Sequence, residues 1–101
     1  MKLLHMYNFR SVEYLLRLAD RFLITSVIER AEEVLLSSRL ISNTEKLRIA
    51  DHYNLFGLQE HCLSNLKSTA DFKTIKDSPI YNEFSNEMKA VLFERVMTVA
   101  K

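Results

Sequence analysis

A segment of this chain, residues 18–31, returns thirty-one residues later as residues 49–62. The residue types match at Leu18/Ile49, Ala19/Ala50, Asp20/Asp51, Phe22/Tyr53, Ile24/Leu55, Val27/Leu58, Glu29/Glu60 and Ala31/Cys62. A fixed offset of about 20 to 50 residues is typical of one supersecondary unit that is used more than once. Here the unit is predicted to be a helical hairpin, and the repeat therefore constrains the fold more than any other feature.

The composition supports a helical fold. The 101 residues include one Gly and one Pro, which leaves little material for strand turns. The apolar fraction of 48% is ordinary for a globular chain, so extensive disorder is not expected. We therefore expect an all-α fold built from antiparallel helical hairpins, with about six helices and no sheet.

Cap signals place the first helices. Ser11 is the predicted N-cap of a helix that has Val12, Leu15, Leu16 and Ala19 on one face. A short link at residues 23–25 makes the chain fold back at once. Ser26 and Glu29 then have capping-box spacing. The buried stripe of this second helix is predicted to comprise Val27, Ile28, Ala31, Val34 and Leu35.

Similar signals place the remaining helices. Residues 42–45 form a second capping box, and Gly57 is the predicted turn between the two helices of the second hairpin. Ser68 is a further helix start, Pro79 is suited to the first residue of the following turn, and Ser85 is the predicted cap of the last helix.

Charge and motif content exclude several functions. Fourteen basic and thirteen acidic residues are interleaved and give a net charge of +1, unlike the one-sided basic surface of a nucleic-acid-binding protein. A single Gly cannot build a P-loop or a Rossmann turn, so no nucleotide cofactor is expected. The apolar run at the start of the chain is too short for the core of a signal peptide. No run of apolar residues is long enough to cross a bilayer. The single cysteine fits an intracellular location.

The residues that could carry chemistry have simpler structural interpretations. His61 and Cys62 are neighbours, but adjacent residues of a helix do not face each other, so a catalytic pair is not expected. His52 lacks enough further ligands nearby to complete a zinc site. Asp20 and Asp51 occupy the same position in the two copies. Each carboxylate is predicted to accept hydrogen bonds where the next helix begins. Because none of these residues forms a catalytic arrangement, we expect no enzymatic activity.

The order of these segments resembles a known family. Residues 12–22, which contain the phrase Leu-Ala-Asp-Arg-Phe, and residues 27–32 look like the last two helices of a BTB/POZ domain. Residues 42–66 resemble the helical hairpin that follows BTB domains in adaptors of cullin-based ubiquitin ligases. The stretch from Ala70 to the last helix is similar to the tail of MATH–BTB adaptors.

The resemblance implies a division of the chain. Residues 1–37 would be the C-terminal helices of a BTB/POZ-like domain, and residues 38–101 would be a BACK-like or 3-box-like extension forming one compact unit. The strand-and-helix unit and the small sheet with which a BTB domain begins are expected to be absent, and with them most of the family's homodimer interface.

The resemblance also implies a function, that of a protein-interaction module. The expected partner is the N-terminal helical region of a cullin, by resemblance cullin-3. Another BTB protein is a second expected partner. Binding to nucleic acid or to a membrane is not expected. The partner-binding residues would be Tyr7, Glu29, Arg30, Glu33, Asn43 and Lys46. The alternative is a truncated structural or regulatory chain that binds no cullin and instead associates with itself or competes with full-length BTB proteins.

Overall fold

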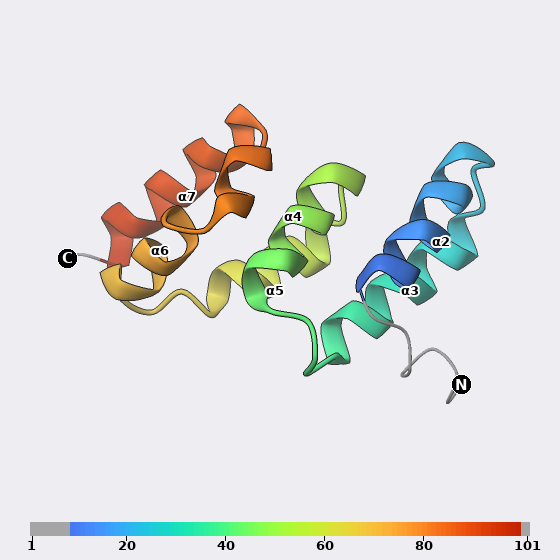
Figure 1. Ribbon diagram of the computed structural model, residues 1–101, viewed down its shortest axis with the longest axis horizontal. Helices are drawn as coiled ribbons and strands as arrows, with labels where there is room; N and C mark the ends of the chain where they lie inside the picture. The colour runs from blue at the N-terminus through green and yellow to red at the C-terminus, as the bar shows by residue number, and fades with distance from the viewer. Residues whose placement is uncertain (1–8, 100–101) are drawn as a thin grey trace. The chain divides into compact units, whose positions relative to one another are not determined.

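The computed structural model describes residues 9–99, which form six α-helices and one 3₁₀ helix (Figure 1). The elements are α2 (Phe9–Arg21), α3 (Thr25–Ser37), α4 (Asn43–Tyr53), α5 (Phe56–Ser64), α6 (Thr69–Lys76), η1 (Pro79–Glu83) and α7 (Asn86–Val99). No β-strand occurs within these residues, and the predicted all-α fold is confirmed. The chain divides into two compact units, residues 1–42 and residues 43–101.

The first unit contains the hairpin of α2 and α3, two antiparallel helices that pack side by side (Figure 1). Its buried side chains are Val12, Leu16 and Ala19 from α2 and Ala31, Val34 and Leu35 from α3. Their helical spacing confirms the two predicted apolar faces at these positions. Leu15, Val27 and Ile28 were expected in the same faces but remain partly exposed.

The turn between α2 and α3 lies at the predicted short link, but it is closed differently from the prediction. Leu23 adopts a left-handed conformation with φ of 56°, and the N–H of Ile24 donates to the carbonyl oxygen of Ala19 at 2.8 Å. This backbone bond satisfies an end carbonyl of α2 in the manner of a Schellman motif. Because α3 begins directly after Ile24 without a side-chain cap, the predicted capping box at Ser26 is wrong. Ser11 is likewise inside α2, not before it.

The second unit begins with the hairpin of α4 and α5, which repeats the same turn. Asn54 has φ of 57°, and the N–H of Leu55 donates to the carbonyl oxygen of Ala50 at 2.9 Å. Gly57 lies inside α5, so the prediction that it marks the turn is wrong. The turn depends on a left-handed residue and a backbone hydrogen bond, and Asn tolerates that conformation better than most residues do.

Exchanging the two left-handed residues is expected to change stability in opposite directions. Leu23 is 83% exposed, so Leu23→Asn removes little buried surface and relieves an unfavourable backbone conformation. We expect it to raise the free energy of unfolding by about 0.5–1 kcal/mol. The matched change Asn54→Leu should lower it by a similar amount. Urea denaturation followed by circular dichroism measures both, and a destabilised Leu23→Asn chain would contradict this account of the turn.

The caps predicted for the later helices are confirmed. Ser68 accepts a hydrogen bond from the backbone N–H of Asp71 at 3.2 Å and caps α6. Pro79 occupies the start of η1 after Ser78, which accepts from the N–H of Ile80. These side chains satisfy N–H groups that have no partner within the helix.

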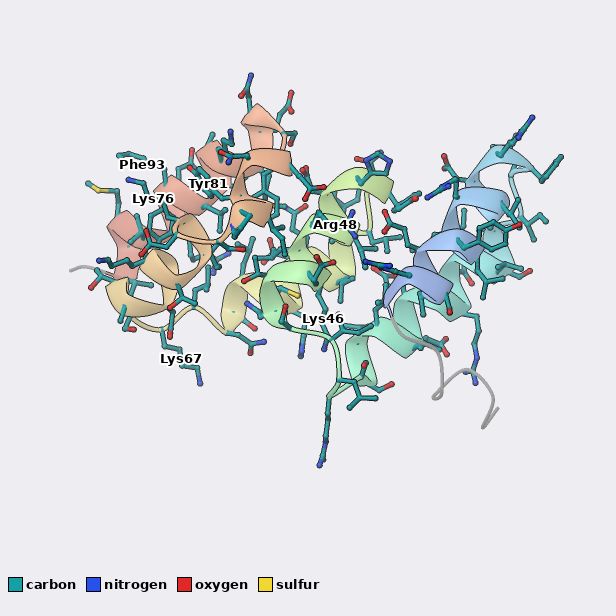
Figure 2. The ribbon with its side chains drawn as sticks, in the orientation of Figure 1. Lys46, Arg48, Lys67, Lys76, Tyr81 and Phe93 are labelled. Atoms are coloured by element: carbon teal, nitrogen blue, oxygen red, sulfur yellow. The ribbon has the colours of Figure 1, made fainter. Side chains whose placement is uncertain are left out.

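The last helix, α7, has one buried and one exposed apolar stripe. Met88 and Leu92 are buried, whereas Phe93 and Met97 are 61% and 56% exposed. Phe93 projects outward from α7 (Figure 2). Within the second unit η1 packs on α4 and on α6, and α6 packs on α7.

The equivalent aspartates of the two copies behave differently. The carboxylate of Asp51 accepts hydrogen bonds from the backbone N–H and the hydroxyl of Ser85, at 2.8 and 2.6 Å. Ser85 in turn accepts from the N–H of Met88 at 3.1 Å and caps α7, as predicted. Asp51 therefore binds where a helix begins, although that helix is α7 and not the one that follows it directly. Among the described residues the carboxylate of Asp20 makes no such bond, so the prediction for Asp20 is wrong.

Candidate functional site

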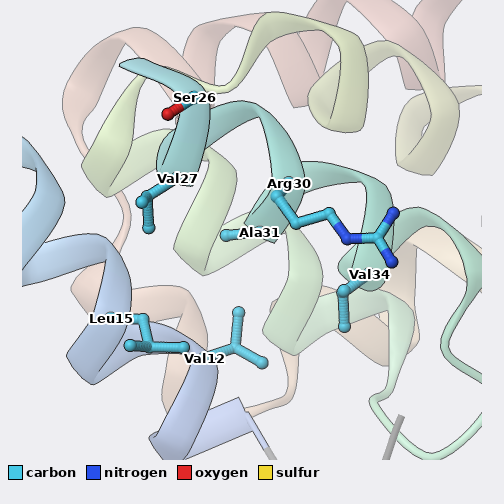
Figure 3. Close-up of a pocket in the computed structure, with 7 residues that line it drawn as sticks. All are labelled: Val12, Leu15, Ser26, Val27, Arg30, Ala31 and Val34. Atoms are coloured by element: carbon cyan, nitrogen blue, oxygen red, sulfur yellow. The ribbon is translucent and has the colours of Figure 1, made fainter. Parts of the chain in front are cut away.

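An apolar hollow lies between α2 and α3 in the first unit (Figure 3). Its volume is about 230 Å³, and it is lined by Val12, Leu15, Ser26, Val27, Arg30, Ala31 and Val34. The two residues from α2 face the aliphatic side chains of α3 across the hollow. An apolar cavity of about 150 Å³ can hold a benzene molecule. This hollow is therefore large enough for one bulky apolar side chain of a partner.

Among the described residues that line the hollow, Arg30 alone is charged. Its guanidinium pairs with the carboxylate of Glu33 at 2.9 Å, and the two side chains are 43% and 62% exposed. An exposed pair of this kind contributes only about 0.2–1 kcal/mol, so a partner's carboxylate could replace Glu33 at little cost. The hollow and this cation together suit an apolar side chain that has an acidic neighbour.

The structure brings together some of the predicted partner-binding residues of the first unit. Arg30 and Glu33 form the ion pair on α3, and Glu29 is exposed on the same helix. Tyr7 lies outside the described residues. The α3 surface that contains these three residues is therefore accessible to a partner.

The two predicted residues of the second unit have internal roles. The side-chain amide of Asn43 donates to the carbonyl oxygen of Cys62 at 3.2 Å, and its oxygen accepts from the amide of Asn65 at 3.2 Å. Lys46 is only 8% exposed. Asn43 thus joins the start of α4 to the end of α5, and both residues support the second hairpin.

Two curated proteins of Caenorhabditis elegans are similar to this chain. BTB and MATH domain-containing protein 38 is 39% identical over 89 residues, which cover 88% of the chain and 23% of that protein. BTB and MATH domain-containing protein 36 is 31% identical over 90 residues, which cover 89% of the chain and 28% of that protein. The chain is related to BTB and MATH domain-containing proteins.

The relation to BTB and MATH domain-containing proteins extends over most of the chain but only part of the relatives. The chain spans about a quarter of the length of the two proteins that it matches. No protein-family model matches the chain, and no solved structure matches it. The relation supports the resemblance to BTB and MATH proteins, and the part of those proteins to which the chain corresponds remains a proposal.

The reactive groups of the described residues form no metal-binding cluster. Cys62 is fully buried, and burial raises the pKa of its thiol from 9.0 to about 11, although the nearby Lys46 charge opposes the shift. Within residues 9–99 no three His, Cys, Asp or Glu side chains could share a metal ion. No helix of the described part is long and apolar enough to cross a membrane.

The buried thiol predicts a loss of stability at high pH. The folded chain keeps the Cys62 proton between pH 9.0 and about 11, whereas the unfolded chain releases it there. The stabilisation is complete below pH 9.0 and is lost as the pH rises to about 11. Relative to a Cys62→Ala chain, the free energy of unfolding should fall by about 2 kcal/mol across this window.

Urea denaturation at several pH values measures the difference between the two chains. Groups that the two chains share contribute to both pH profiles, so the difference between the profiles reports the thiol and its surroundings. Thiol-labelling at about pH 8 should also be slow in the native wild-type chain. Equal pH profiles for wild-type and Cys62→Ala would contradict the prediction.

The sequence did not reveal the hollow. Val12, Leu15, Val27, Ala31 and Val34 have the spacing of a buried face and were interpreted as core. A groove and a core produce the same periodic pattern, because both need apolar side chains on one side of a helix. The single usable signal was Arg30, a charged residue next to this stripe.

Proposed function

We propose that this chain is a protein-interaction module that binds the N-terminal helical region of a cullin, as the C-terminal part of a BTB-type substrate adaptor. The observation that carries the proposal is the apolar hollow between α2 and α3 with Arg30 beside it, in a chain related to BTB and MATH domain-containing proteins. The partner by resemblance is cullin-3, and the module would act inside the cell. The adaptor would perform no chemistry itself and would help to present substrates for ubiquitin transfer.

The proposed contact is built from an apolar anchor and a charged rim. A partner side chain would enter the hollow and remove its aliphatic lining from water, which contributes about 25 cal/mol for each Å² that is buried. Arg30 lines the hollow, Glu33 pairs with it, and Glu29 is exposed on the same helix; these charges would select the charge of the partner. Of the other residues that the resemblance implies, Tyr7 lies outside the described residues, and Asn43 and Lys46 have internal roles in the second hairpin.

The proposal includes an assignment of the two parts of the chain. Residues 1–37 would correspond to the last helices of a BTB/POZ domain, and residues 38–101 to the BACK-like or 3-box-like extension. The two compact units, residues 1–42 and 43–101, support a boundary in this region.

A titration with a purified cullin-3 N-terminal region tests the function directly. Isothermal calorimetry should detect a Kd in the micromolar range or tighter. Absence of binding at about 100 µM would reject the cullin proposal, because a contact that weak contributes less than about 5.5 kcal/mol. The N-terminal region of a cullin from another class serves as the matched control and should bind more weakly.

The exposed apolar residues of the first unit favour one alternative function. Tyr14 of α2 and, in the turn after it, Phe22 and Leu23 are 57%, 64% and 83% exposed. Exposed apolar side chains of this size suit self-association or association with another BTB protein. Sedimentation velocity over a range of concentrations tests this. A monomer that binds cullin would reject the alternative, and a dimer that does not bind cullin would favour it.

A further inference from the structure

The two hairpin turns have the same geometry as well as related sequences. The left-handed residues Leu23 and Asn54 have φ of 56° and 57°. The residues that follow them have φ and ψ of −92° and 86° at Ile24, and of −89° and 84° at Leu55. The helix-ending backbone bonds measure 2.8 and 2.9 Å. Asp20 lies four residues before Ile24, and Asp51 lies four residues before Leu55. The two aspartates therefore have the same position relative to their turns.

The second copy shows what this arrangement can hold. The carboxylate of Asp51 accepts both the N–H and the hydroxyl of Ser85, which caps α7. Phe84 and Met88, on either side of this cap, are 4% and 2% exposed. Asp51 thus binds the start of a helix in which an aromatic residue is followed by serine and, three residues after the serine, by an apolar residue. Two hydrogen bonds to one carboxylate make the contact directional as well as strong.

The first copy presents the same elements to solvent. Asp20 is exposed, and its carboxylate has no hydrogen bond or ion pair among the described residues. Ile24 is 43% exposed, whereas its counterpart Leu55 is 5% exposed. Phe22 is 64% exposed, while its counterpart Tyr53 is partly buried. Leu23 of this turn is 83% exposed and has a left-handed backbone conformation that is unfavourable for leucine. The first turn is therefore not optimised for stability.

We propose that Asp20, Phe22 and Ile24 form a docking site for a helical segment of a partner protein that begins with an aromatic residue followed by serine. The serine N–H and hydroxyl donate to the Asp20 carboxylate, as Ser85 does to Asp51. The aromatic residue and the apolar residue one turn into the partner helix cover Phe22 and Ile24. This site differs from the hollow of the proposed function and does not rest on cullin binding.

The chain's own sequence supplies the probe. A peptide of residues 78–92 contains the aromatic–serine start that Asp51 holds. Titrated into the full chain and followed by amide chemical shifts, it is expected to perturb residues 20–25. The natural segment already occupies Asp51 at a high effective concentration, so the peptide should bind at Asp20.

Substitutions on both sides of the contact give the expected result. Asp20→Asn in the chain, or Ser85→Ala in the peptide, should weaken binding at least about tenfold, the effect of losing a charge-assisted hydrogen bond. Glu29→Gln is the matched control, an exposed carboxylate of the same unit, and should change the affinity less than about twofold. Asp20→Asn should leave cullin binding unchanged, which separates this site from the proposed function.

Three results with the peptide would overturn the inference. They are no binding of the peptide up to about 2 mM, equal affinity for wild-type and Asp20→Asn chains, and peptide-induced shifts confined to the second unit. Dimerisation of the wild-type chain that Asp20→Asn abolishes, without peptide binding, would also reject it, because the occupant would then be a second copy of this chain.

Discussion

Asp51→Ala is expected to lower the free energy of unfolding by about 3 kcal/mol. The carboxylate accepts two hydrogen bonds from Ser85, at 2.8 and 2.6 Å, and both donors belong to the residue that caps α7. Hydrogen bonds to a charged group contribute about 1.5–3 kcal/mol each, and partly buried donors without an acceptor add a cost. Urea denaturation, followed by the circular dichroism of the helices at about 222 nm, measures the change.

The repeat provides the control for this prediction. Asp20→Ala makes the same chemical change at the equivalent position of the first copy, where the carboxylate has no described partner. Its effect should remain within about 0.5 kcal/mol. A double-mutant cycle of Asp51→Ala with Ser85→Ala should give a coupling energy of at least about 1 kcal/mol. Equal effects of Asp20→Ala and Asp51→Ala would show that the link to Ser85 does not stabilise the fold.

Local sequence rules predicted the helices and several of their caps correctly. Ser68, Pro79 and Ser85 lie where polar or fixed-φ residues satisfy a helix start, and each was located from its own neighbours. The repeat predicted paired hairpins, and the structure has them. These features are predictable because they depend on interactions within a few residues.

The same rules located the first hairpin turn but not what closes it, and they misplaced the second. The short link at residues 23–25 was predicted, whereas its cap was assigned to Ser26 and the second turn to Gly57, although that turn is at Asn54. Both turns are closed by a backbone bond from the following residue to the carbonyl of Ala19 or Ala50. A leucine in the left-handed region has no local signal, because packing of the two helices compensates for its backbone conformation.

The candidate site was predicted only in part. Exposed charges on α3 were identified from the sequence, and the structure places Arg30 and Glu33 within 2.9 Å of each other. The apolar hollow could not be foreseen, since its depth depends on how closely α2 and α3 approach. Asn43 was selected as a partner-binding residue, but its amide is used between α4 and α5. A sequence shows which polar residues a helix has, and their internal bonds appear only in three dimensions.

Val27→Glu is expected to abolish cullin binding if the hollow is the anchor site. Val27 lines the hollow and is partly exposed, in the first turn of α3. A carboxylate there would place charge in the hollow where the partner's apolar side chain must pack, and it would compete with the partner for Arg30, which lines the same hollow. This cost should weaken binding at least about 30-fold, or 2 kcal/mol. Calorimetry with the cullin-3 N-terminal region measures the loss.

Folding and binding can be separated in this variant. An acidic side chain in the first turn of a helix interacts favourably with the helix dipole, which offsets part of the apolar surface that Val27→Glu loses. We therefore expect the free energy of unfolding to fall by less than about 1.5 kcal/mol. Thr25→Glu adds the same charge to the same turn at an exposed residue that does not line the hollow. It should retain binding within about threefold. If both variants bind like wild type, a cullin contact must lie elsewhere on the chain, and the hollow then has no part in it.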